Sequence, residues 1–166
     1  MAEIRTLGLA SIEIGDPVDG GVATTFAALG VTYKDTATIS EEDPAEAPHY
    51  SEENEDPEEI LYSKGKKTIK WSIMDSSPAT LAKILGGTTE GTAPNNTWDG
   101  PRALFNVEKS VKITPRSGHI IVFPRVKLSG KMNYKLARTG IFLVDITGTV
   151  LIPTDGETAP VSMYLD

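Results

Sequence analysis

The residues with the most obvious capacity for chemistry lie in one acidic run, residues 41–59, which reads EEDPAEAPHYSEENEDPEE. Clustered carboxylates can bind Ca²⁺, but this run lacks the order of acids and the mid-loop glycine of an EF-hand. A solvated loop is a second interpretation, because three prolines and many charges leave little to bury. A surface that meets a basic patch on a neighbouring copy is a third. The run contains ten acidic residues and no lysine or arginine: Glu41, Glu42, Asp43, Glu46, Glu52, Glu53, Glu55, Asp56, Glu58 and Glu59.

Signatures of catalysis and cofactor binding are missing from the sequence. The two histidines, His49 and His119, have no partner at a metal-ligand spacing, and we interpret both as surface residues. The chain has no cysteine, so disulfides and thiolate chemistry are excluded. No nucleophile elbow, P-loop or dinucleotide fingerprint occurs. We therefore expect a protein that is not an enzyme and that needs no cofactor or metal.

Charge is unevenly distributed along the 166 residues. The formal net charge is −7, which argues against a dedicated nucleic-acid-binding protein. Of the 23 acidic residues ten lie in the run, so the rest of the chain has thirteen acids against sixteen bases, a formal charge of +3. No apolar stretch is long enough to span a membrane, and the N-terminus lacks the pattern of a signal peptide. We expect synthesis in a cytoplasm and no membrane partner.

One segment combines a strand with the only convincing helix of the chain. Ile69, Trp71 and Ile73 alternate with polar residues, which is typical of a half-buried strand. A helix over 78–85 is predicted to follow, with Ser77 as N-cap and a pair of glycines as its stop. Leu81, Ile84 and Leu85 form its apolar stripe.

Most of the remaining chain has the alternation of β-strands. Asp35 interrupts one alternating segment, Pro124 another and Gly148 a third, so we expect a bulge, a bend or a close approach at each. Residues 86–102 are predicted to be an exposed loop, in which Trp98 is either core or interface. Strands are predicted over 7–14, 29–40, 60–62, 107–114, 119–128 and 141–152, with an edge strand in the C-terminal tail. The pattern predicts one domain over 1–166, mainly β: an antiparallel β-sandwich or small barrel with one flanking short helix and a long acidic loop.

Two stretches carry a resemblance to a known family. They are WSIMDSSPATLAKILGG at 71–87 and VEKSVKITPRSGHIIVFPRVKLSGKMNYKLARTGIFLVDITGTVLIP at 107–153. With the Gly/Thr/Asn-rich loop between them, the chain resembles the major tail tube proteins of long-tailed bacteriophages over most of residues 29–153. The inner-tube protein of type VI secretion and the tubes of other contractile injection systems share that fold. The unusually acidic run departs from the family pattern.

The resemblance implies a structural virion protein without catalytic residues. Members form hexameric rings that stack into a tube, through whose lumen DNA passes without specific binding. It also implies other tail proteins as partners: the tape measure, the tail terminator and the baseplate. A carbohydrate- or Ca²⁺-binding β-sandwich, or a tube of a phage-like injection system, remains the alternative.

The charge pattern suggests how such copies would meet. We expect the acidic loop to be mobile in an isolated subunit and to dock on a basic surface of an adjacent copy. Exposed ion pairs are weak singly, about 0–1 kcal/mol each, but several around a ring could set its register. The predicted interface residues are Glu52, Glu53, Glu55, Asp56, Glu58 and Glu59 on the acidic side, and Lys64, Lys66, Lys67, Lys127, Lys131, Lys135 and Arg138 on the basic side.

Overall fold

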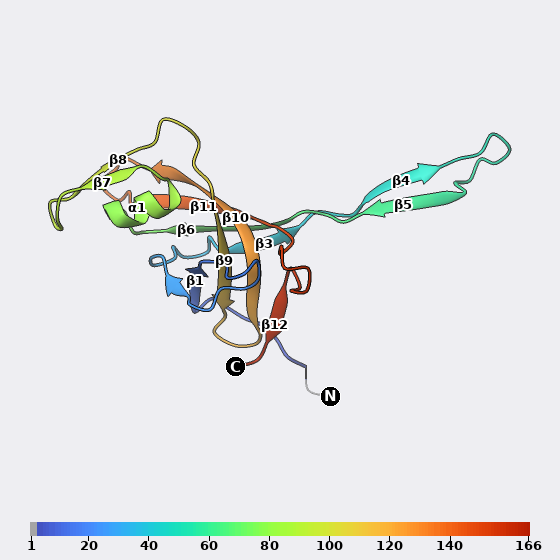
Figure 1. The fold of residues 1–166 in the computed structure, drawn as a ribbon, viewed down its shortest axis with the longest axis horizontal. Helices are drawn as coiled ribbons and strands as arrows, with labels where there is room; N and C mark the ends of the chain where they lie inside the picture. Colours follow the sequence, from blue (N-terminus) through green and yellow to red (C-terminus); the bar gives the residue numbers. More distant parts are fainter. Residues whose placement is uncertain (1–2) are drawn as a thin grey trace.

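A computed structural model describes residues 3–166, and in this range the regular secondary structure consists of antiparallel strands and one short helix. The predicted fold class, a mainly β protein with one short helix, is confirmed. Figure 1 shows a β body that carries the helix, with a two-stranded hairpin projecting far from it. The elements are β1 (Ser11–Gly15), β2 (Ala27–Ala28), β3 (Thr38–Glu41), β4 (Ala45–His49), β5 (Glu59–Ser63), β6 (Lys67–Ile73), α1 (Pro78–Ile84), β7 (Thr88–Glu90), β8 (Thr97–Asp99), β9 (Val107–Thr114), β10 (Ile120–Tyr134), β11 (Phe142–Val150) and β12 (Ser162–Tyr164).

The body is one eight-stranded sheet in the order β2-β1-β9-β10-β11-β6-β3, with β12 also paired to β10. The central strand β10 changes partners along its length. Its first part lies between β9 and β12, and its second part lies between β9 and β11. The register with β9 shifts between Phe123 and Val126, so the irregularity expected at Pro124 is a bulge. Because a bulge bends a strand, the two halves of the sheet can face each other across a core.

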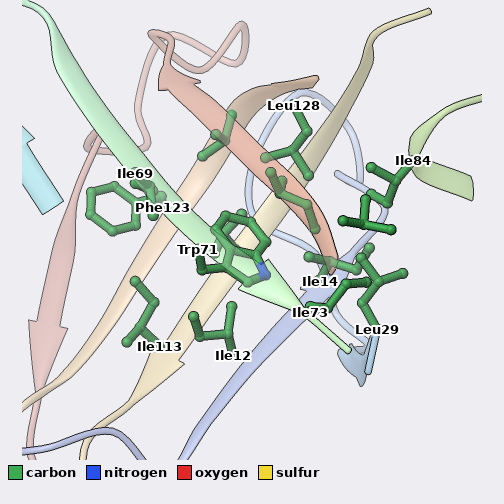
Figure 2. Packing of buried hydrophobic residues seen from close by; sticks show 14 of the residues in the cluster. Ile12, Ile14, Leu29, Ile69, Trp71, Ile73, Ile84, Ile113, Phe123 and Leu128 are labelled. Carbon is green, nitrogen blue, oxygen red and sulfur yellow. The ribbon is translucent and has the colours of Figure 1, made fainter. Parts of the chain in front are cut away.

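The core is filled by apolar residues that both halves of the sheet supply, together with the helix. Figure 2 shows Trp71 and Ile69 of β6 and Phe123 of β10 gathered in this cluster, with Ile84 of α1 at its edge. All four side chains are almost fully buried. A side chain at Gly148 would meet Val126 and Leu128, so the close approach expected there occurs. The strand predicted over 141–152 ends earlier, at Val150, and Ile152 beyond it is 73% exposed.

The helix begins and ends close to the predicted positions. Pro78 is its first residue, and Gly86 and Gly87 follow it with left-handed φ angles of 75° and 90°. Ser77 is the N-cap residue, but its side chain makes no capping bond to the backbone. The carboxylate of Asp75 holds this end of the helix in another way, since it accepts hydrogen bonds from the Ser77 backbone N–H (2.8 Å) and from the Thr80 hydroxyl (2.7 Å).

Three predicted elements differ from the structure. The strand expected over 29–40 is divided into two parts. Residues 31–33 form hydrogen bonds with the end of β6, whereas β3 pairs with the beginning of β6. Asp35 lies in the turn between the two parts with φ of 59°, so a bend was expected at the correct residue but the continuous strand was wrong. The strand over 7–14 begins only at Ser11. The predicted loop at 86–102 contains the short hairpin β7–β8, and Trp98 is partly buried against the core.

Candidate assembly surfaces

The acidic run forms most of a hairpin that we call the arm, residues 43–64. The run was predicted to be a long exposed loop; it is exposed, but much of it is paired, because β4 pairs with β5 over five residue pairs from Ala45↔Ser63 to His49↔Glu59. Figure 1 shows the arm extending from the body along the longest axis of the molecule. Its tip, residues 50–58, carries five of the predicted interface acids, and Glu59 follows at the start of β5. They are Glu52, Glu53, Glu55, Asp56 and Glu58, all exposed.

The arm also exposes apolar side chains on both of its faces. Cross-strand partners point to the same face of a ribbon. Tyr62 and Ile60 therefore share one face with Pro48, and Leu61 lies on the other. Tyr62 is 64% exposed and Leu61 52%. Among the elements of residues 3–166, β4 and β5 make their substantial contacts only with each other. An isolated two-stranded hairpin is at best marginally stable in water. The arm is thus a hairpin whose apolar side chains remain exposed to solvent in the single chain.

The root of the arm holds three of the predicted basic residues. Lys67 forms an ion pair with Glu41 of its own chain at 3.6 Å, and the backbone of Lys66 accepts a hydrogen bond from the Glu42 N–H. A side chain at Gly65 would collide with the Glu42 carbonyl oxygen, so the two chains approach closely here. Lys64 and Lys66 are exposed, but they lie at the base of the very arm whose acids they were expected to meet.

A second surface lies at the opposite end of the body, and we call it the distal face. It consists of the loop over 100–105 and the β10–β11 tip over 131–141, which contain no acidic residue. Figure 1 shows the end of β10 beside β7, β8 and α1, far from the arm. Its basic residues are Arg102, Lys131, Lys135 and Arg138, all exposed, and its exposed apolar residues are Leu104, Met132, Tyr134, Leu136 and Ile141.

The distal face is held by packing beneath it. A shallow apolar hollow of about 400 Å³ separates the 100–105 loop from β10, with Trp98 among its lining residues. The Trp98 indole N–H donates to the Gly86 carbonyl oxygen at 2.8 Å, which ties the β7–β8 hairpin to the end of the helix. Gly130 lets β10 approach the helix, since a side chain there would lie 2.4 Å from a methyl group of Ile84. Helix and hairpin therefore position this surface.

Lys127 is separate from both groups. It lies on the outer face of the sheet, in register with Glu108 of β9. Arg125 donates to Glu108 at 2.8 and 3.0 Å, and this bond lowers the pKa of the Glu108 carboxyl, with the charge of Lys127 as a smaller contribution. The structure thus brings together Lys131, Lys135 and Arg138, but it leaves Lys127 along the sheet.

Several residues of the distal face were not identified from the sequence. Leu136, 85% exposed, and Leu104, 84% exposed, are its most prominent apolar side chains. A signal for Leu136 existed, because the even-numbered apolar positions of β10 continue through Met132 and Tyr134 to this residue. Arg102 and Leu104 stand in a loop without a pattern, so only the fold could place them here.

No family model matches the chain, and a search of curated proteins finds no relative. Within residues 3–166 no group of three or more His, Asp or Glu residues is placed to hold a metal ion. His49 is exposed on the arm opposite Glu59, and His119 is half-buried at the start of β10. Over the same range, no helix is long and apolar enough to cross a membrane.

Proposed function

We propose that this protein is a structural subunit that assembles head to tail, of the kind that builds the tail tube of long-tailed bacteriophages. The observation that carries the proposal is the pair of complementary surfaces at opposite ends of one chain. The arm is acidic and exposes apolar side chains, while the distal face is basic and exposes apolar side chains. A surface that matches another part of the same molecule favours a heterologous contact between copies.

Apolar burial would supply most of the attraction in such a contact. Leu61 and Tyr62 of the arm and Leu104 and Leu136 of the distal face are all more than half exposed. Fully burying a large apolar side chain stabilises by about 1.5–3 kcal/mol, so these partly exposed groups would each contribute less than that. The charges would chiefly set orientation and speed of encounter, because exposed ion pairs contribute only about 0–1 kcal/mol each.

Repeating a heterologous contact gives either a closed ring or an open filament, depending on the rotation between copies. Stacked rings with DNA in the lumen are the assembly that the resemblance implies, with the tape measure, tail terminator and baseplate proteins as partners and the virion tail as location. An acidic protein suits a DNA path, because phosphate contacts to lysine and arginine would retain the nucleic acid. A tube of a phage-like injection system would use the same two surfaces.

Negative-stain electron microscopy of the concentrated protein at low salt tests the proposal, and rings or tubes are expected. The variant Glu53→Gln/Glu55→Gln/Glu58→Gln should assemble more weakly and keep the melting temperature of the parent. A matched control removes three exposed acids from the body: Glu3→Gln/Glu157→Gln/Asp166→Asn. It should assemble like the parent. A monodisperse monomer at every concentration and salt would refute the proposal, and equal loss in both variants would refute the role of the arm.

A further inference from the structure

A groove with a volume of about 970 Å³ opens beside the core, away from the distal face. Residues 6–9, β1 and the end of β9 form one wall, and residues 32–39 with β6 form the other. Ile12 and Ile113, which are cross-strand partners on β1 and β9, lie together at one side of the core in Figure 2. With Ile69 of β6 they line the groove, so the apolar core continues directly into its lining.

The mouth of this groove exposes side chains whose sequence pattern predicts burial. Tyr33 and Ile39 belong to the alternating segment 29–40, yet they are 40% and 46% exposed. Ligand pockets in proteins typically have volumes of about 300–1,000 Å³ and mainly apolar linings with a few polar groups. The size and lining of the groove fall within that description.

The adjoining sheet edge is poorly suited to adding a strand. Asp35 turns the edge with a left-handed φ of 59°. The Ser72 N–H donates to the Thr36 hydroxyl at 3.1 Å, where a regular ladder would continue through the backbone. An edge whose backbone ladder is interrupted in this way is a poor template for strand addition. An occupant that brings no backbone hydrogen bonds fits the groove better than an extended peptide does.

Two cations on the rim indicate the charge of that occupant. Arg116 and Lys34 both line the groove, and neither forms an ion pair within residues 3–166. Gly8 leaves room for the aliphatic part of Arg116, since a side chain there would lie 3.2 Å from the Arg116 Cδ. Asp35, beside Lys34, is the only carboxylate among the lining residues, so the rim has a net positive charge.

We propose that the groove binds a single-chain amphiphile with a carboxylate head group. The alkyl chain would lie along the isoleucines of the two walls, and the carboxylate would meet Arg116 and Lys34. Neither the arm nor the distal face contributes to this site, so the inference goes beyond the proposed assembly and does not depend on it.

Isothermal titration calorimetry with octanoate, decanoate and dodecanoate, each below its micelle-forming concentration, tests the site. Each methylene that enters the groove should tighten Kd about four-fold, which corresponds to about 0.8 kcal/mol. Arg116→Gln should weaken dodecanoate binding about tenfold, because hydrogen bonds to a charged group are stronger than neutral ones. The same variant should leave the binding of uncharged dodecyl maltoside unchanged. Affinity that is independent of chain length would overturn the proposal.

A matched pair of isoleucine substitutions separates groove binding from non-specific binding. Ile39→Asp places a carboxylate at the mouth of the groove and should abolish dodecanoate binding. Ile60→Asp makes the same change at a similarly exposed strand position on the arm and should leave binding intact. Equal affinity of both variants would disprove the site. If Ile39→Asp instead changes the sedimentation of ligand-free protein, a second copy covers the groove and the amphiphile proposal fails.

Discussion

Exchanging charges between the arm and the distal face would show whether these two surfaces meet. The first variant, Lys135→Glu/Arg138→Glu, reverses two exposed cations of the β10–β11 tip. The second, Glu53→Lys/Glu55→Lys, reverses two acids of the arm tip. If both pairs of charges face each other in the assembly, either variant replaces attraction with repulsion, and the combined variant restores opposite charges.

The expected size of the effect follows from the exposure of these groups. All four side chains are on the surface, so each attraction is worth about 0–1 kcal/mol. Losing two attractions and gaining two repulsions of similar size should weaken association by about 1–2 kcal/mol, or roughly 5- to 30-fold in Kd. Raising the salt from 50 to 500 mM should remove most of the difference, because the Debye screening length shortens as salt rises, from about 10 Å at 0.1 M to about 3 Å at 1 M.

Sedimentation velocity at a series of concentrations measures this association for all four proteins. The combined variant should recover at least half of the loss summed over the two separate variants, as coupled sites do in a double-mutant cycle. Losses that simply add, with no recovery, would show that arm and distal face do not contact each other. Far-UV circular dichroism and melting temperature serve as controls, and neither should change.

Two further predictions concern the frame that holds these surfaces. The fully buried Ser110 hydroxyl donates to the Pro124 carbonyl oxygen at 2.6 Å and accepts from the Ala23 N–H at 3.0 Å, so Ser110→Ala leaves two buried groups without partners. It should cost about 2–4 kcal/mol in urea unfolding, while the exposed Ser162→Ala should cost under about 0.5 kcal/mol. At Asp75, burial raises the carboxyl pKa, but the bonds from Thr80 and Ser77 lower it more, to below its usual value of 3.8. A carboxyl whose pKa is lower in the folded state stabilises the fold above the unfolded pKa, and this stabilisation is lost as the pH falls through the folded pKa. The melting temperatures of parent and Asp75→Asn should therefore differ at pH 6, and the difference should shrink as the pH falls below 3.8; a constant difference would refute the assignment.

Local patterns predicted the elements whose packing depends on neighbours in the sequence. The alternation of Ile69, Trp71 and Ile73 and the helix stop at Gly86 are both present, because periodicity and left-handed φ are decided locally. The strand over 107–114 has the predicted bounds for the same reason. Ser77 is the N-cap residue, as predicted, but its hydroxyl donates to Asp75 at 3.1 Å and does not bond the helix backbone. The partner that a hydroxyl selects depends on how its neighbours are placed, which the residue pattern does not give.

The candidate surfaces were only partly predictable. The acidic run was evident, but its folding into a projecting hairpin depends on Ile60 and Tyr62 pairing with the strand before the tip. Of the seven basic residues proposed, three meet on one surface, since strand β10 extends past Leu128 to Tyr134. Lys67 was expected to be free for a neighbour and instead forms an ion pair with Glu41. Which charges gather is a property of strand register and length, which composition does not determine.

The bulge in β10 links the fold to the proposed assembly. A straight β10 would keep β9 and β11 in one flat sheet, whereas the register shift after Phe123 turns its second part toward the distal end. β11 pairs with this second part of β10 and β6 pairs with β11, so both strands follow the turn, and β6 continues directly from the arm. The strands that carry the distal face and the arm are therefore neighbours in one bent layer, and they leave the core at its opposite ends (Figure 1). The distance between the two surfaces is fixed by hydrogen-bonded strands, as the proposed assembly with a constant repeat would require.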